Sequence, residues 1–562
     1  MKSYPLLVVL LVVFLVGAFT AQAAPIRKKL IETGWDQPDT ATLRKNVAEM
    51  EQQTPFDGVI IGCTGVKADG TKASLRPVFS STPWEAQWFQ SCIDDLQATP
   101  FKRFTDNFVI IGANPGNVDW FDDEGWKNVV EHWRIAARVA RQGKVKGLLF
   151  DPEAYTKPYQ QFKYAAQAQK DQHTFIEYVA KARQRGQEVM QAVAAEYPDI
   201  TLYTYFMNSV NAIATGNPDP LVPLLSSGYG LYPAFVDGWL DVVPPTVKII
   251  DGCESAYLFN STQQFLHAAV QMKVDAQSLV SPENRAKYRA QVQSSFGIYV
   301  DAYANPAGSP WFIDGKGGAR VDRLRQNVSD ALWAADEYVW VYGEKSTWWP
   351  YPHPSIKTKW DETMPGATDA LRMATDPADY GRRKLSEMVA AGTATNLTRN
   401  GDFSSDKAAG PTPDVMLDWK TGGAPAGWNT WLEDPTKGTF TWDRETGGGS
   451  ARASGVAGGC FIQTILPVEP GQVYAVQAKY KLQGQGSASI RIRWQTPEGK
   501  WIHDQLDRLV YGSGKATDWQ ELTGVAEVPE GVGRLIILLG VGGQAGDQDV
   551  VWFDDVRAYR LK

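Results

Sequence analysis

Short apolar runs alternate with amphipathic segments over about residues 28–344 of the chain. Apolar runs of this length bounded by turn residues are typical of buried strands, whereas apolar positions repeating every three to four residues are typical of helices. The alternation predicts eight strands, each followed by a helical segment. The predicted strands cover residues 28–38, 57–65, 106–116, 144–156, 200–209, 246–257, 296–306 and 337–350.

Eight strand–helix pairs predict an α/β fold of the (β/α)8 TIM-barrel type. The alternative is a doubly wound open sheet, which commonly carries a glycine-rich phosphate loop after its first strand. No such loop follows residues 28–38. The count of eight and the missing loop together favour the barrel.

The pattern changes at about Asn396, where helical periodicity stops and short runs with period two begin. Residues 473–484, 487–496 and 533–543 are clear examples, separated by Gly, Pro and Asp. This texture predicts an all-β jelly-roll sandwich. We therefore expect a signal peptide at 1–23, a barrel catalytic domain at 24–394 and a β-sandwich carbohydrate-binding-like module at 395–562.

The first residues form a third pattern: a lysine, a long apolar run and then small residues, with Ala21-Gln22-Ala23 as a cleavage site. This order is typical of a secretory signal peptide, and an uncleaved membrane anchor is the alternative. We expect a secreted protein, extracellular or periplasmic, that contacts no membrane after the signal is removed.

Charge and composition narrow the partners. The net charge is −7, from 56 basic and 63 acidic residues, without a basic block that could follow a phosphate backbone. We expect no nucleic acid partner, and we expect a monomer. The 21 Trp, 22 Tyr and 22 Phe supply either platforms for sugar rings or large aromatic cores. Four scattered cysteines exclude a disulfide scaffold or a zinc cluster.

Polar and aromatic residues gather where the predicted strands end, which in a TIM barrel is the catalytic face. Glycoside hydrolysis needs this set: one carboxylic acid, a second carboxylate, and aromatic or amide groups that hold sugar hydroxyls and rings. It needs no metal or organic cofactor. The candidates for substrate binding are Trp35, Asp36, Asn114, Tyr155, Tyr205, Asn208, Asp251, Tyr257, Tyr303, Trp348 and Trp349.

The catalytic candidates are Glu153, Asp151, Glu254, Asp301 and Glu344. Asp151 and Glu153 are two positions apart on a predicted strand, so we expect them to face the same side. Adjacent carboxylates can keep one proton near neutral pH. Asp301 is in phase with Tyr299 and Tyr303, which predicts that these three share a face. For each carboxylate, a structural ion pair is the alternative.

The segment "FDPEAY" at the end of the fourth strand resembles the Asp-x-Glu ending of chitinase-type glycoside hydrolases of family 18. The resemblance implies that Glu153 is the acid and that Asp151 assists it. The longer D-x-x-D-x-D-x-E signature is missing, because residues 144–149 contain no acidic residue. Substrate-assisted chemistry on an N-acetyl sugar is therefore not implied.

Five C-terminal segments resemble, in order, carbohydrate-binding modules of the CenC type: "NLTRNGDFSS", "PAGWNTW", "VEPGQVYAVQAKYKLQG", "WQELTGVAEVPEG" and "VWFDDVRAY". The resemblance implies a structural Ca²⁺ held by Asp402 and Asp555, since calcium favours oxygen ligands. Sugar platforms are expected among Trp428, Trp431, Trp494 and Trp501, with at least half of these in the core.

The sequence therefore predicts an exported glycoside hydrolase that cleaves O-glycosidic bonds of a poly- or oligosaccharide. Two alternatives stay open at this point. One is a non-catalytic glycan-binding surface protein, and the other is a transglycosylase.

Overall fold

The computed structural model describes residues 27–156, 160–349, 353, 355–405, 424–514 and 516–562. The predicted signal peptide at 1–23 lies outside these residues. Contacts divide the chain into two compact units, Met1–Leu371 and Arg372–Lys562, called the N-terminal and C-terminal units below. Among the described helices, none is both long and apolar enough to cross a bilayer.

The N-terminal unit is built on a ten-stranded sheet in the order β10-β9-β8-β7-β6-β2-β1-β12-β11, with β5 paired to β6. Neighbouring strands in this order run parallel, and their central residues are buried. The strands are β1 (Lys29–Gly34), β2 (Gly58–Ile61), β5 (Pro77–Phe79), β6 (Phe108–Pro115), β7 (Gly147–Asp151), β8 (Thr201–Thr204), β9 (Lys248–Asp251), β10 (Val292–Ser294), β11 (Phe296–Tyr299) and β12 (Tyr338–Gly343).

This sheet is a nearly closed barrel. β10 pairs with β9, β11 pairs with β12, and only Ser295 separates β10 from β11. The seventh predicted strand is therefore present, but it begins at Val292 instead of 296 and ends at Tyr299 instead of 306. All strands expected from the pattern of apolar runs are found, and the carboxyl ends of parallel strands meet at one edge.

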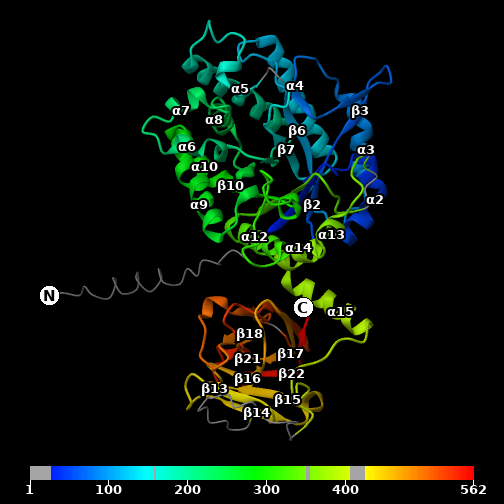
Figure 1. Ribbon diagram of the computed structural model, residues 1–562, viewed down its shortest axis with the longest axis vertical. Helices are drawn as coiled ribbons and strands as arrows, with labels where there is room; N and C mark the ends of the chain where they lie inside the picture. The colour runs from blue at the N-terminus through cyan, green and yellow to red at the C-terminus, as the bar shows by residue number, and fades with distance from the viewer. Residues whose placement is uncertain (1–26, 157–159, 350–352, 354, 406–423, 515) are drawn as a thin grey trace, which may run out of the picture. The chain divides into compact units, whose positions relative to one another are not determined.

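Helices lie around the outside of the sheet (Figure 1). Each follows a strand, as the alternation of patterns predicts. The helix α2 shows why one begins where it does: the carboxylate of Asp39 accepts the backbone N–H of Thr42 at 2.7 Å, an N-cap. The longer helices are α2 (Thr40–Gln53), α3 (Gln90–Ala98), α4 (Asp123–Gln142), α5 (Phe175–Glu196), α8 (Tyr232–Val242), α9 (Thr262–Lys273) and α12 (Arg320–Ala334).

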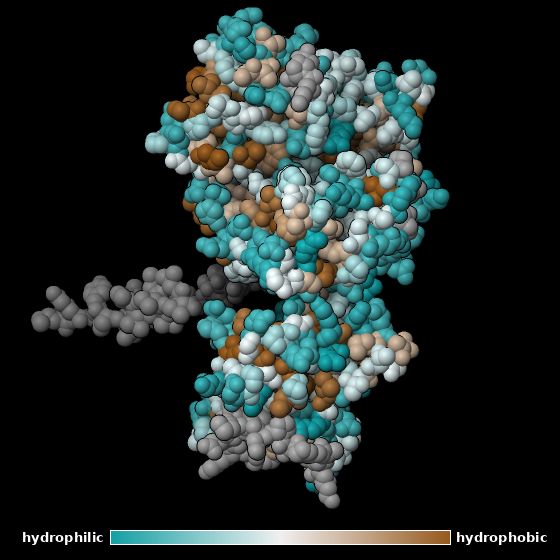
Figure 2. Space-filling model, viewed as in Figure 1, coloured by the Kyte–Doolittle hydropathy of each residue, from teal (hydrophilic) through white to brown (hydrophobic). Residues whose placement is uncertain are grey.

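Shorter elements lie in the connections. The helices α6 (Ala212–Thr215) and α7 (Leu221–Ser226) follow β8, and in Figure 2 hydrophobic residues gather over them on an otherwise largely hydrophilic face. The remaining short elements of the N-terminal unit are β3 (Thr64–Val66), β4 (Lys72–Ser74), α10 (Arg285–Gln291), α11 (Asp301–Ala304), α13 (Trp360–Thr363) and α14, which runs from Ala367 to Thr375 across the division.

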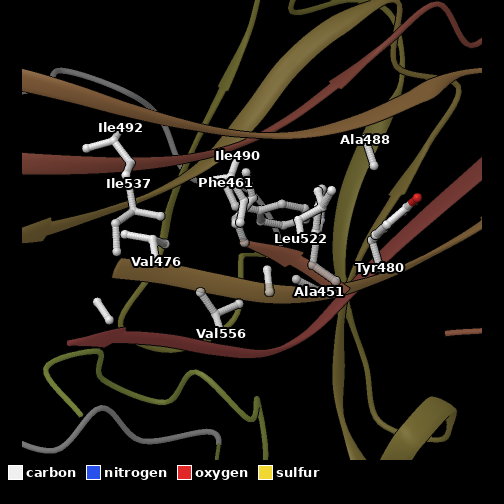
Figure 3. Close-up of a cluster of buried hydrophobic side chains, with 14 of the residues drawn as sticks. Ala451, Phe461, Val476, Tyr480, Ala488, Ile490, Ile492, Leu522, Ile537 and Val556 are labelled. Carbon is white, nitrogen blue, oxygen red and sulfur yellow. The ribbon is translucent and has the colours of Figure 1, made fainter. Parts of the chain in front are cut away.

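The C-terminal unit contains two five-stranded antiparallel sheets, in the orders β13-β16-β21-β18-β19 and β14-β15-β22-β17-β20. Their inner faces share one apolar core (Figure 3), to which Ile490 and Ile537 contribute from the first sheet and Val476 and Val556 from the second. The strands are β13 (Asn429–Leu432), β14 (Thr439–Asp443), β15 (Ser450–Ser454), β16 (Gly458–Ile465), β17 (Val473–Gln483), β18 (Ser487–Gln495), β19 (Arg508–Tyr511), β20 (Gln520–Glu527), β21 (Arg534–Gly542) and β22 (Val550–Arg560).

The division between the units falls at Leu371/Arg372, whereas the change of sequence pattern suggests residue 394. The difference arises from α15 (Pro377–Ala390), whose Tyr380 and Leu385 pack against Val473 and Val525 of β17 and β20. Helical periodicity therefore continues past the point where the C-terminal unit begins, because this unit includes a helix.

Candidate functional site

A cavity of about 420 Å³ lies at the carboxyl ends of the parallel strands. Seven residues predicted from the strand ends line it: Trp35, Glu153, Tyr155, Tyr205, Glu254, Tyr257 and Glu344. They come from the segments that follow β1, β7, β8, β9 and β12, which the barrel brings to one edge. The structure thus joins three of the five catalytic candidates, Glu153, Glu254 and Glu344, in one cavity.

Glu153 lies in the segment that follows β7. Its carboxylate accepts the hydroxyl of Tyr155, and its backbone N–H donates to Asp151 at 3.0 Å. Asn114 fixes this segment from β6: its amide donates to the carbonyl of Glu153 and accepts the N–H of Tyr155, both at 3.0 Å. Burial raises the pKa of Glu153, while the Tyr155 hydroxyl and Arg76 oppose the shift.

Asp151 does not face the cavity with Glu153, although the sequence predicts that both lie on the same side. The strand β7 ends at Asp151, so the strand alternation that would place both on one side does not extend to Glu153. Asp151 is fully buried and pairs with Arg76 at 2.7 Å. Burial raises its pKa, opposed by this arginine. The carboxylate of Asp151 therefore supports the segment below Glu153 instead of lining the cavity.

Glu254 follows β9 and begins a short 3-10 helix (Glu254–Leu258). Cys253, just before it, is held at φ +43°, a left-handed conformation that is uncommon for residues other than glycine. Within the described part of the chain, the Glu254 carboxylate has no hydrogen-bond donor. Burial, reinforced by the negative charges of Glu153 and Asp151, raises its pKa to about 8.

Glu344 follows β12 and accepts the hydroxyl of Tyr299 at 3.2 Å. Asp301 lies behind it and accepts the backbone N–H groups of Glu344 and Lys345, at 2.7 and 3.1 Å. Asp301 belongs to the helix α11, because β11 ends at Tyr299. The prediction that Asp301 and Tyr303 continue the strand face of Tyr299 is therefore wrong.

Aromatic side chains form much of the cavity wall. The ring of Tyr257 stacks on Tyr342 at 5.9 Å and lies 5.2 Å from Tyr299. Trp311 meets the edge of this cluster and is 45% exposed, and Trp35 is 55% exposed. Ring faces beside convergent polar groups are the usual composition of a small-molecule site.

Seven predicted substrate-binding residues do not line the cavity: Asn114, which holds the segment of Glu153 in place, and six others. Asp251 is buried and accepts the N–H groups of Met207 and Ser209 at 2.9 and 2.8 Å. Asp36 is buried and accepts the N–H of Trp348 at 3.1 Å. Asn208, Tyr303, Trp348 and Trp349 are likewise buried, with at most 5% of each exposed. Backbone donors and core packing occupy these side chains, and Tyr303 accepts the amide of Asn327 at 2.8 Å.

Sequence reasoning did not assign several lining residues to the site. Trp311 lies in a connection away from the strand ends, Arg76 precedes β5, and Gln37 follows β1 by three residues. Arg76 pairs with Asp151 at 2.7 Å and lies 5.9 Å from the ring of Tyr155. Tyr299 is the last residue of β11 and Tyr342 the last but one of β12, so both lie where the strand-end rule that selected Tyr205 applies.

A second cavity, of about 450 Å³, lies on the C-terminal unit over the sheet that contains β18. Of the four tryptophans considered as sugar platforms, Trp431 and Trp501 line it and are 41% and 39% exposed. Trp428 and Trp494 are buried in the core, with 4% and 1% exposed. We call this cavity the sheet groove.

The two residues implied as calcium ligands have other partners. Asp555 forms ion pairs with Lys479 at 3.1 Å and with Arg557 at 2.6 Å. Asp402 accepts the hydroxyl of Ser404 at 3.0 Å. A cation at this position would have to displace Lys479 and Arg557 from Asp555. Calcium binding therefore stays a prediction.

Comparison with known proteins gives only distant matches. The enzymatically active domain of tailspike protein 4 of bacteriophage CBA120 is 18% identical, with a TM-score of 0.22; the alignment covers 29% of this chain and 21% of that one. The arabinose-bound α-L-arabinofuranosidase MgGH51 is 12% identical, with a TM-score of 0.21; the alignment covers 29% of this chain and 26% of that one. The xylan-binding domain CBM22-1 of Paenibacillus barcinonensis Xyn10C is 16% identical, with a TM-score of 0.20; the alignment covers 27% of this chain and 99% of that one.

No protein-family model and no curated protein matches the sequence. At TM-scores near 0.2, the similarity to solved structures does not transfer a function to this chain. The residues of the two cavities are therefore the basis for assigning one.

Proposed function

We propose that the protein is an exported glycoside hydrolase in which a (β/α)8 barrel cleaves the O-glycosidic bonds of a poly- or oligosaccharide. In the same proposal, the C-terminal unit is a jelly-roll module that binds carbohydrate. One observation supports the catalytic part above all. Glu153 and Glu254 line the same cavity, and Glu254 has a pKa of about 8 because it is buried and faces the charge of Glu153.

The environments of the two glutamates assign their roles. Glu153 accepts a hydrogen bond from Tyr155 and feels the charge of Arg76, and both favour its ionised form. Glu254 has neither interaction, and its pKa of about 8 keeps it protonated at neutral pH. Glu254 is then the acid and Glu153 the second carboxylate. This order differs from the acid role that the chitinase-type resemblance implies for Glu153.

The reaction follows from this pair. Glu254 gives its proton to the leaving glycosidic oxygen as the bond from that oxygen to the anomeric carbon breaks. Glu153 acts on the anomeric carbon, directly or through a water that it deprotonates, and the hydroxyl of water finally resides on that carbon. Glu344, bonded by Tyr299, accepts hydrogen bonds from sugar hydroxyls, and the rings of Tyr257 and Trp311 pack on sugar faces.

Substitution tests these roles. Glu254→Gln and Glu153→Gln are each expected to lower kcat by at least about a hundredfold, the lower end of the effect of one acid or base group. Glu344→Gln, the matched control in the same cavity, is expected to raise KM more than it lowers kcat. Release of reducing ends from a panel of polysaccharides measures both parameters.

Each alternative function predicts a different result. Binding of several glycans without cleavage of any would identify a non-catalytic glycan-binding protein. Transfer products formed with an added acceptor alcohol would identify a transglycosylase. Unchanged turnover by Glu254→Gln would remove the assignment of the acid.

A further inference from the structure

The floor of the sheet groove is made of small residues. Ser489 of β18 and Gly540 of β21 lie opposite each other there. A Cβ atom on Gly540 would lie 2.4 Å from the Ser489 hydroxyl oxygen, so a larger residue would fill this space. The next residues along the two strands, Ile490 and Leu539, point to the other side of the sheet and face the core. The groove is therefore an open channel over the outer face of a well-packed sheet.

Exposed rings form its sides. Trp431 of β13 lies at one side, and Trp501 and Tyr511, 39% and 67% exposed, lie on the side of β19. Flat aromatic faces of this kind suit the apolar faces of sugar rings. This part of the groove would bind neutral and charged sugars alike.

Two arginines distinguish the groove from a neutral sugar site. Arg491 and Arg493 project from β18 into it. Both contact one carboxylate, Asp507, whose side chain is only 4% exposed: Arg491 at 2.6 Å and Arg493 at 3.0 Å. Asp504 lies 4.0 Å from Arg491, but its side chain is 59% exposed, so solvent screens it. One positive charge therefore remains without a buried counter-ion.

Of the two arginines, Arg493 has guanidinium N–H groups that are available to a ligand. Its guanidinium lies 4.7 Å from the centre of the Trp501 ring, which orients it beside the sugar platform. Its buried Nε atom is the one that lies 3.0 Å from the Asp507 carboxylate, without the geometry of a hydrogen bond, and no described residue accepts a hydrogen bond from its other two nitrogens. A guanidinium in this state is suited to bind a carboxylate of a ligand.

We propose that the sheet groove binds an acidic glycan, a polymer that carries uronate carboxylates, through Arg493 and Arg491. This inference rests on the proposed carbohydrate-binding role of the C-terminal unit and names the charge class of its ligand. The catalytic cavity has the opposite character: three glutamates line it, and its Arg76 is already paired with Asp151. The groove therefore selects charged units of a polymer whose uncharged units enter the cavity.

Binding to matched pairs of polymers tests the proposal. The full chain carrying Glu254→Gln, which prevents turnover, is titrated with polygalacturonate, alginate, glucuronoxylan and hyaluronate. Each is compared with its carboxyl-reduced form, in which the uronate becomes a neutral sugar with the same linkages. We expect at least one acidic polymer to bind more tightly than its reduced form, with an affinity that falls as salt is added.

Arg493→Gln is the specific variant. Asp507 keeps Arg491 at 2.6 Å, so this change leaves the buried carboxylate paired. We expect it to weaken binding of the acidic polymer about tenfold, as for loss of one charge-assisted hydrogen bond, and to abolish discrimination against the reduced form. The matched control is Arg508→Gln on β19, which removes the same charge from the opposite face of the sheet and is expected to change nothing.

The other outcomes contradict either the inference about charge or the carbohydrate-binding role itself. If acidic polymers bind no better than their reduced forms, or if both arginine variants weaken binding equally, the inference about charge is wrong while the carbohydrate-binding role stands. If neither the acidic nor the reduced forms bind, the carbohydrate-binding role of the C-terminal unit is wrong as well.

Discussion

At the scale of single residues, environment separates carboxylates that are chemically alike. Asp151 and Asp251 are the last residues of β7 and β9, and Asp301 lies two residues after β11, yet each is buried against backbone donors or an arginine. Glu153 and Glu254 reach the cavity because they lie two or three residues farther along the chain. Proximity and burial then raise the pKa of Glu254 to about 8, the value that a proton donor near neutral pH requires.

The first prediction at this scale concerns the alkaline side of the pH profile. The acid must be protonated, so kcat/KM is expected to fall about tenfold per pH unit above about pH 8, where Glu254 of the free enzyme ionises. Asp151 contributes to the raised pKa, so Asp151→Asn should move this limb to lower pH. Asp275→Asn, an exposed carboxylate on the same unit, should leave it in place. An unmoved limb in Asp151→Asn would contradict the assignment of Glu254.

The second prediction concerns the acidic side. The second carboxylate must be ionised, and the Tyr155 hydroxyl lowers the pKa of Glu153. Tyr155→Phe removes this hydrogen bond, so the pKa of Glu153 rises and activity is lost at a higher pH than in the wild type. Tyr299→Phe is the control, because Tyr299 bonds Glu344 instead of Glu153. Equal shifts in both variants would argue against Glu153 as the titrating group.

At the scale of elements, short local contacts decide where strands end and helices begin. The strand β11 gives way to α11 at Asp301, which turns this carboxylate toward the backbone of the segment after β12. At the other helices, capping has the same role. Thr174 and Glu177 form a capping box at the start of α5, and Asp39 caps α2 just after the cavity residues Trp35 and Gln37.

The third prediction tests the cap of α2. Asp39→Ala is expected to destabilise the N-terminal unit by about 1 kcal/mol, because the N–H of Thr42 loses its acceptor. Asp39→Asn keeps an acceptor at the same place and should retain most of the stability. Urea unfolding, followed through the transition of the N-terminal unit, measures the difference. Equal loss in both variants would show that the charge of Asp39, and not the cap, is what stabilises the unit.

At the scale of the whole molecule, the chain contains two units, each with its own core. The C-terminal unit includes α15, whose Tyr380 and Leu385 cover Val473, Val525 and other apolar residues of the second sheet. Without this helix, those residues would be exposed to water, at a cost of roughly 25 cal/mol for each Å² of apolar surface. The change of sequence pattern at about Asn396 is therefore not the boundary of the folded unit.

The fourth prediction follows from this boundary. A fragment of residues 372–562 is expected to fold and remain soluble, whereas a fragment of residues 395–562 is expected to be less stable and to aggregate. Thermal unfolding and size-exclusion chromatography compare the two. Leu385→Ala in the longer fragment should lower its stability, while Val389→Ala, at a 60% exposed position of the same helix, should not. Equal stability of the two fragments would show that α15 is dispensable.

Periodicity was sufficient to predict the parallel strands, the helices between them and the antiparallel C-terminal sheets. It also predicted the edge at which the cavity lies, because strand order and chain direction determine where carboxyl ends meet. Seven lining residues were assigned on that basis alone. These features depend on contacts between neighbours in sequence, which a local pattern records.

The tertiary structure alone decided which carboxylates reach solvent and what surrounds them. Trp348 and Trp349 follow β12 in the chain as Glu344 does, yet they are buried in the core. Arg76 and Trp311 join the cavity from distant connections, and α15 packs on the sheets that follow it. Burial, pKa and partner choice arise from residues far apart in the chain, so a local pattern does not contain them.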